Sequence, residues 1–453
     1  MGRHQAGAGG RRWRLTALLG VGAFLVALAL TLITTLPGGA GAGPGEGPAL
    51  GWGFTHTQYS ADSGDAAAER RARKALKAAP LPQNQHVMGW GASNPEPSPG
   101  RYDFAELDRR VALMRASGSA PVLTLCCAPD WMKGGAEGRT DWSEESLETA
   151  PDPAHYQDFA DLAAKIARRY PDVRHFVVWN EFKGFWNDEA ARWDHEGYTA
   201  LYNKVWTALK QVDEDLLVGG PYLVMDSVAP GAGGGSTAVT GAWGALDARV
   251  VAAFRYWNAH KKGADFVVVD GSSYTADDAL VPGTFTAADK FTDVGRWVRE
   301  ETGGLPLWWN EYYVEPGDEN DDRDGWSEDK RVAVQAAGMI ALAKGGAATA
   351  FYWNPQTRAA GACAGCLWTS TERANGGAPL PMLRLVQDFQ RAFGPGTRYR
   401  SVDVAPAARR AVRVLADADR VLVVNTRATP VRAEVDGRSL ALGPYEVRWS
   451  ERR

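Results

Sequence analysis

Several features that would point to particular classes of protein are scarce or missing in this sequence. The net charge is −4 over 453 residues, so the chain has no basic excess for binding nucleic acid. Only 7 histidines are present, and none is spaced with carboxylates as in a metal site. No strand-like run leads into a glycine-rich dinucleotide-binding motif. We therefore expect no metal, no cofactor and no nucleic-acid partner.

Cysteine is also rare, with 4 in the chain. Cys363 and Cys366 are spaced C-x-x-C in a Gly/Ala-rich loop, which predicts a local disulfide. Half of a zinc site is the alternative, but the only other thiols are Cys126 and Cys127. These two close an apolar run, so we expect them to be buried free thiols.

An apolar run stands near the N-terminus. Arg11, Arg12 and Arg14 precede it, and a linker of small residues follows it. This order is typical of a secretory signal, and the run is also long enough for a membrane anchor, which needs about 20 residues. We expect residues 1–36 to be a signal peptide or anchor and residues 37–49 a flexible linker. The rest is then extracellular or held on the outer face of the cell membrane, and only the N-terminal segment contacts the membrane.

From residue 50 onward, strand-like apolar runs alternate with amphipathic helical stretches. The runs begin near residues 50, 86, 121, 175, 216, 265, 305 and 347. Eight such units predict a (β/α)8 TIM barrel over residues 50–395, and an open doubly wound sheet is the alternative. Residues 396–453 contain short runs broken by Asp, Gly and Pro, which predict a small antiparallel β module.

Two of these runs end in the same polar pair. The fourth run closes with Trp179-Asn180-Glu181 and the seventh with Trp309-Asn310-Glu311. In a TIM barrel the chemistry takes place at the carboxyl ends of the strands, so Glu181 and Glu311 should face each other across the barrel mouth. Glycoside hydrolysis uses two carboxyl groups, and a separation of about 5 Å suits a retaining double displacement. For either pair alone, a strand end that meets solvent is an equally good interpretation.

These two motifs resemble those of clan A glycoside hydrolases. The chain is most similar to glycoside hydrolase family 39, which includes β-xylosidases and α-iduronidases. The stretches Trp90-Gly-Ala-Ser-Asn94 and Ala128-Pro-Asp-Trp131 also look like loops of that clan. The resemblance implies that Glu181 is the acid/base and Glu311 the nucleophile. It further implies that the pKa of Glu181 is raised in the free enzyme.

The resemblance also implies roles for neighbouring residues. Asn180 is expected to hydrogen-bond the 2-hydroxyl of the sugar, Tyr274 to orient Glu311, and Trp353 to stack under the reactive sugar. Further substrate-binding candidates are His56, Asn94 and Trp131. The sequence has no cluster of basic residues that would bind the carboxylate of a uronic acid. This absence favours β-xylosidase-like over iduronidase-like chemistry.

The sequence therefore predicts an exported, retaining glycosidase that hydrolyses O-glycosyl compounds, similar to a xylan 1,4-β-xylosidase acting on oligo- or polysaccharides. The expected partner is the carbohydrate substrate, and the sequence makes no prediction of the oligomeric state. The alternative is a non-catalytic carbohydrate-binding surface protein on a glycosidase scaffold. The presence of both carboxylates argues against this alternative.

Overall fold

A computed structural model describes residues 47–317, 325–357 and 363–452 of the chain. The predicted signal or anchor segment (1–36) and most of the predicted linker lie outside the described residues. No helix in the described ranges is long and apolar enough to cross a membrane.

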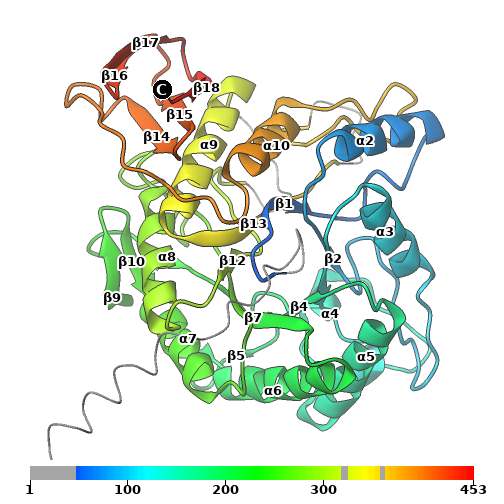
Figure 1. Ribbon diagram of the computed structural model, residues 1–453. Helices are drawn as coiled ribbons and strands as arrows, with labels where there is room; N and C mark the ends of the chain where they lie inside the picture. The colour runs from blue at the N-terminus through cyan, green and yellow to red at the C-terminus, as the bar shows by residue number, and fades with distance from the viewer. Residues whose placement is uncertain (1–46, 318–324, 358–362, 453) are drawn as a thin grey trace, which may run out of the picture. The chain divides into compact units, whose positions relative to one another are not determined.

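Eight parallel strands close into a barrel in the order β1-β13-β12-β11-β7-β4-β3-β2, which confirms the predicted TIM barrel (Figure 1). The strands are β1 (Gly51–Thr55), β2 (Gln83–His86), β3 (Pro121–Leu125), β4 (His175–Val178), β7 (Leu217–Val224), β11 (Phe266–Asp270), β12 (Leu307–Trp309) and β13 (Ala347–Trp353). A main helix follows each strand in turn: α2 (Ala66–Ala78), α3 (Ala105–Ala116), α5 (Tyr156–Arg169), α6 (His195–Val212), α7 (Ala248–His260), α8 (Asp289–Glu301), α9 (Glu328–Lys344) and α10 (Pro381–Phe393).

The interior of the barrel is filled by large apolar side chains from neighbouring strands. Phe266 of β11 and Trp308 of β12 stack with their ring centroids 3.9 Å apart, and Phe351 of β13 packs against Trp308 at 5.8 Å. These residues are fully buried. The barrel is therefore a solid core rather than a pore, and it holds the strand ends in fixed positions.

Small elements interrupt the connections that leave the carboxyl ends of the strands. A short helix, α4 (Glu144–Glu148), follows β3, and a hairpin of β5 (Trp186–Asn187) and β6 (Arg192–Trp193) follows β4. A small sheet of β8 (Ser227–Val228), β9 (Gly235–Gly241) and β10 (Gly244–Asp247) follows β7. The enlarged loops therefore lie on the face where TIM barrels carry their active sites.

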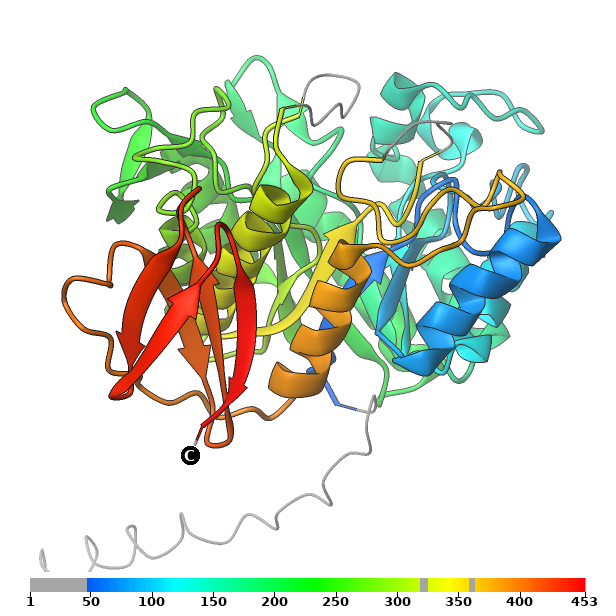
Figure 2. The same cartoon turned by 90° about the horizontal axis from the view of Figure 1, so that it is seen from above.

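The C-terminal β module packs on the barrel through α9 and α10, as Figures 1 and 2 show. It has a three-stranded sheet of β14 (Val412–Ala416), β15 (Arg420–Asn425) and β18 (Val447–Glu451), and a pair formed by β16 (Val431–Val435) and β17 (Arg438–Leu442). Along β15, Val421 and Val423 belong to the module's own core, whereas Leu422 and Val424 belong to the main core of the chain. This alternation of period two buries both faces of the sheet.

The four cysteines lie as predicted. A disulfide joins Cys363 and Cys366, and Cys126 and Cys127 are buried free thiols.

A buried ion pair ties β1 and β2 to α3. Arg110 of α3 is fully buried, and its Nε lies 3.0 Å from Oδ2 of Asp62. The guanidinium also donates to the carbonyl of Thr57 at 3.0 Å and to Oε1 of Gln85 at 2.6 Å. The buried charge is thus balanced by one carboxylate and two neutral acceptors.

Removing Asp62 should therefore be costly. We expect Asp62→Ala to lower the free energy of unfolding by about 3–5 kcal/mol, because it leaves a buried guanidinium without its counter-charge. Chemical denaturation of the protein measures this loss. Glu69→Ala is the control, since it removes the partly exposed pair with Arg73 and should cost about 0–1 kcal/mol. Equal losses in the two variants would contradict the expectation.

Candidate active site

The two Asn-Glu pairs lie at one edge of the barrel. Glu181 follows β4 and Glu311 follows β12, with β7 and β11 between those strands in the barrel order. A third carboxyl joins them, since Asp270 ends β11. One carboxylate oxygen from each of Glu181, Asp270 and Glu311 lies within 4.8 Å of the other two. The fold therefore gathers three carboxyl groups from three strand ends.

The turn that carries Glu181 has an unusual backbone. Trp179, Glu181 and Phe182 have φ angles of +68°, +50° and +54°, in the left-handed region that residues other than glycine rarely adopt. The surrounding contacts hold this turn in place. The indole of Trp179 donates to the carbonyl of Lys183 at 2.8 Å, and the buried ring of Phe182 lies 4.0 Å from that of Tyr198. Such strain persists only where the structure imposes it, and it is common at functional sites.

The carboxylate of Glu181 has a cation and an amide beside it. Nζ of Lys183 lies 3.2 Å from Oε2 of Glu181, and Nδ2 of Asn180 donates to the same oxygen at 3.4 Å. Lys183 also pairs with Glu148 of α4. The two carboxylates outweigh the effect of burial and raise the pKa of Lys183, so it is charged.

Two phenols hydrogen-bond the carboxylate of Glu311. Tyr222 donates to Oε1, and Tyr313 donates to Oε2 at 2.5 Å. Tyr222 has φ +52° and is the extra residue of a β-bulge, because Pro221 pairs with Val268 and Leu223 with Val269. Bulges next to active sites re-aim side chains, and this one brings the phenol of Tyr222 to Glu311.

Three carboxyls this close, two of them buried and Glu181 half-buried, cannot all be ionised. Burial, followed by the charge of Glu181, raises the pKa of Asp270 well above its ordinary value. The same two causes raise the pKa of Glu311 to about 8, because they outweigh the hydrogen bonds from the two phenols. Burial also acts to raise the pKa of Glu181, but the hydrogen bond with Asp270 and the charge of Lys183 outweigh it and lower that pKa.

The raised pKa that the resemblance implied for Glu181 is therefore wrong for the free protein. The expectation treated Glu181 and Glu311 as a pair. It took no account of the ammonium of Lys183 or of Asp270, both of which favour the ionised form of Glu181.

Aromatic side chains and a histidine lie beside Asn180. Nε2 of His86, at the end of β2, is 3.2 Å from Oδ1 of Asn180. Burial lowers the pKa of His86 to about 4, so the ring is neutral and its Nε2–H donates to the amide oxygen. The ring of His86 lies 4.8 Å from that of Trp90 and 5.9 Å from that of Trp353. The predicted residues Asn180 and Trp353 thus both lie beside His86.

Other predicted substrate-binding residues make contacts within the protein. His56 is fully buried between Ser60 and Gln83. The amide of Asn94 donates to Thr140 at 3.0 Å, and the indole of Trp131 donates to the carbonyl of Glu96 at 2.8 Å. The carbonyl of Tyr274 accepts from Lys290 at 3.3 Å, whereas the phenols on Glu311 are those of Tyr222 and Tyr313. The binding roles of His56, Asn94, Trp131 and Tyr274 stay predictions.

Comparison with known protein families finds one match, which covers part of the barrel. The model of glycosyl hydrolases family 39 matches residues 94–231, which include β3, β4 and β7 and therefore Glu181 and Tyr222. The resemblance to glycoside hydrolase family 39 is confirmed. Among curated proteins, none matches this chain.

Solved structures similar to the chain include two proteins described as family 39 enzymes. A family 39 β-xylosidase from Caulobacter crescentus is 18% identical, with 83% of this chain and 77% of that chain covered and a TM-score of 0.52. A family 39 glycoside hydrolase from Bacteroides cellulosilyticus WH2 is 13% identical, with 90% and 80% covered and a TM-score of 0.53. A conserved exported protein from Bacteroides fragilis is 12% identical, with 88% and 94% covered and a TM-score of 0.57. At these identities the likeness shows the fold alone.

The sequence analysis missed several residues of this candidate site. They are His86, Trp90, Lys183, Tyr222, Asp270 and Tyr313. A signal was present for some of them, since Tyr313 follows Glu311 by two residues and Asp270 closes the sixth run just as the two glutamates follow theirs. The bulge that brings Tyr222 to Glu311 has no comparable signal in the sequence.

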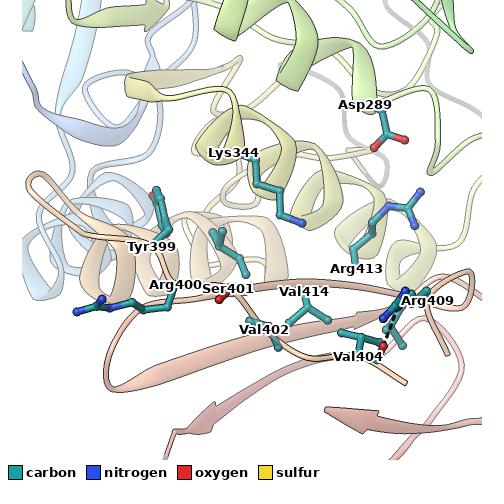
Figure 3. A pocket seen from close by; sticks show the side chains of 12 residues that line it. Asp289, Lys344, Tyr399, Arg400, Ser401, Val402, Val404, Arg409, Arg413 and Val414 are labelled. Atoms are coloured by element: carbon teal, nitrogen blue, oxygen red, sulfur yellow. Dashed lines mark hydrogen bonds between the residues drawn. The ribbon is translucent and has the colours of Figure 1, made fainter. Parts of the chain in front are cut away.

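A cavity lies away from the three carboxyls. It has a volume of about 550 Å³ and lies between α8, α9 and the C-terminal module (Figure 3). Its charged lining residues are Asp289, Lys344, Arg400, Arg409 and Arg413. None of the predicted site residues lines it. This cavity is therefore separate from the candidate active site.

The charge of Glu181 should control the protonation of Glu311. In a Glu181→Gln variant we expect the pKa of Glu311 to fall from about 8 toward the ordinary glutamate range, because a like charge is removed while the phenols stay. Carbon-13 NMR titration of the labelled carboxyl measures this pKa without any substrate. Tyr222→Phe should shift the same pKa upward, since a hydrogen bond to the ionised form is lost. Shifts of the same sign in the two variants would contradict this account.

Proposed function

We propose that this protein is a retaining glycoside hydrolase that cleaves O-glycosidic bonds by double displacement. The observation that carries the proposal is the approach of Glu181 and Glu311 to within 4.8 Å at the carboxyl ends of two barrel strands. Retaining enzymes hold their two carboxyls about 5–5.5 Å apart, whereas inverting enzymes need about 6.5–9.5 Å to admit a water molecule.

In this proposal Glu311 is the nucleophile. Its ionised carboxylate attacks the anomeric carbon while Glu181 gives a proton to the leaving oxygen. Water then attacks the glycosyl ester, and Glu181 takes a proton from that water. Tyr222 and Tyr313 hold the attacking carboxylate in position through their two hydrogen bonds. Accepting from His86 fixes the amide of Asn180, whose NH₂ group is then available to the 2-hydroxyl of the sugar.

We propose β-xylosides as the first substrates to test, within oligo- or polysaccharides. The support is the family 39 match and the description of one similar structure as a family 39 β-xylosidase. Trp90 and Trp353, which are half-buried with their ring centroids 6.3 Å apart, are the aromatic side chains on which such a sugar would stack. The N-terminal segment supports action outside the cell or on its outer face.

Replacing the nucleophile should abolish hydrolysis, and a small added anion should restore cleavage of the substrate. We expect Glu311→Ala to lower kcat on aryl β-xylosides by about 10⁴-fold or more, because no glycosyl ester can form. Added azide should enter the vacated space and give a glycosyl azide of inverted configuration. Glu189→Ala is the control, since Glu189 is an exposed carboxylate of the hairpin that follows Glu181.

The assay uses a panel of aryl glycosides and then polysaccharides, with product configuration read by NMR. A product of inverted configuration from the wild-type protein would refute the double displacement. Binding of a glycan without turnover over long incubation would instead favour the non-catalytic carbohydrate-binding alternative.

Hydrolysis should not depend on a metal ion. The three carboxyls are close enough to hold a cation, but the ammonium of Lys183 lies 3.2 Å from Glu181 and repels one. We therefore expect unchanged kcat/KM after dialysis against a chelator. Loss of activity that returns on adding back a divalent metal would contradict this expectation.

A further inference from the structure

Asp270 is a third carboxyl in a site that needs two. It ends β11, which lies between β4 and β12 in the barrel order. Its side chain is 1% exposed, and an oxygen of it lies within 4.8 Å of oxygens of both Glu181 and Glu311. Its Oδ1 has no hydrogen-bond partner among the described residues. A buried carboxyl placed there with one oxygen unpaired calls for a function.

We propose that Asp270 holds the proton that Glu181 passes to the leaving group, so that the two residues share one catalytic proton. The proposal rests on the proposed function, and it gives the acid role to a pair of carboxyls instead of one.

The neighbours of the three carboxyls assign the proton to Asp270. Glu181 has the ammonium of Lys183 at 3.2 Å, and Glu311 accepts from the two phenols of Tyr222 and Tyr313. Both arrangements favour an ionised carboxylate.

Asp270 has a weaker counter-charge. The charge of Lys290 of α8 acts on Asp270 less than on Asp226, and its ammonium donates to the carbonyl of Tyr274 at 3.3 Å. Burial lowers the pKa of Lys290 to about 8, and burial of Asp270 itself disfavours its charge. Asp270 is therefore the carboxyl that keeps a proton when the other two are ionised.

The proton transfers balance in both steps. In the first step Glu181 takes the proton of Asp270 and delivers a proton to the glycosidic oxygen, as Glu311 forms the ester and the leaving group departs as an alcohol. Asp270 is then ionised. In the second step water attacks the ester, a proton of that water passes through Glu181 to Asp270, and Glu311 is released as a carboxylate.

This scheme keeps the charge of the site constant. In the form that reacts, Glu181 and Glu311 are ionised and Asp270 is neutral before the first step, and Glu311 reaches this form as the pH rises through its pKa of about 8. After that step Glu181 and Asp270 are ionised and Glu311 is an uncharged ester. Two negative charges are present in each state, so the buried site does not have to accommodate an extra charge at either stage.

Asp270→Asn tests the proposal, because the amide still donates a hydrogen bond to Glu181 but cannot give up a proton. For an aryl or alkyl glycoside with a poor leaving group, we expect kcat/KM to fall by about 10²–10⁴-fold. For a dinitrophenyl glycoside, which needs no acid, kcat/KM should change little. With the poor leaving group, the basic limb of the pH profile should move to lower pH, because Glu181 must then hold the proton itself beside Lys183.

Ser273→Ala is the matched control. It removes a buried hydroxyl from the loop that continues β11 without changing charge, and it should keep both the leaving-group dependence and the pH profile of the wild type. An equal loss for all leaving groups in Asp270→Asn, with an unshifted pH profile, would show a structural role only and overturn the proposal. Because wild-type hydrolysis would continue in that case, the proposed function would stand. Failure of the wild type to hydrolyse any glycoside would overturn both.

Infrared spectroscopy locates the proton without a substrate. At about pH 9, above the pKa of Glu311 at about 8, the wild type should still show the carbonyl stretch of a protonated buried carboxyl. The band should disappear in Asp270→Asn and remain in Ser273→Ala. Persistence of the band in Asp270→Asn would overturn the proposal whatever the kinetics show.

Discussion

The repulsion among three closely spaced carboxyls is the interaction on which the rest of the site depends. Glu181, Asp270 and Glu311 lie within 4.8 Å of one another, and one lysine, Lys183, contacts Glu181 directly. Ionisation of any one of them therefore raises the pKa of the other two. The phenols of Tyr222 and Tyr313 and the ammonium of Lys183 decide which carboxyls ionise first. In such a site the acid and base roles belong to the cluster rather than to single residues.

The barrel brings the three carboxyls together, and its packed interior offsets the unfavourable free energy of their repulsion. Parallel strands all end at one edge, so polar residues that follow β4, β11 and β12 must meet there. The interior below them is packed with Phe266, Trp308 and Phe351, which leaves the strand ends little freedom to separate. The left-handed backbone at Glu181 and the bulge at Tyr222 are local distortions that the rigid core can sustain. The favourable free energy of core packing thus keeps the three carboxyls close together despite their repulsion.

The sequence predicted the barrel and the meeting of Glu181 with Glu311, because both depend on periodic patterns. Apolar runs mark strands, and the order of strands in a closed barrel fixes which ends face each other. The positions of Tyr222 and Lys183 could not be predicted, because they depend on a bulge and on a turn with positive φ that leave no periodic signal. Asp270 was visible at the end of its run, but its effect on Glu181 became clear only from their proximity. The pKa expectation for Glu181 was wrong for that reason.

The sheet of the C-terminal module has one face in the module's own core and the other in the main core of the chain. Residues 396–453 are thus a separate segment of sequence that does not form a separate cooperative unit. Detaching it would uncover Leu422 and Val424, and it would expose the rings of Phe389 and Phe393, on which Trp449 packs. Gain or loss of this module as a unit would therefore leave apolar surface uncovered on both sides. The module has to change together with the helices that it covers.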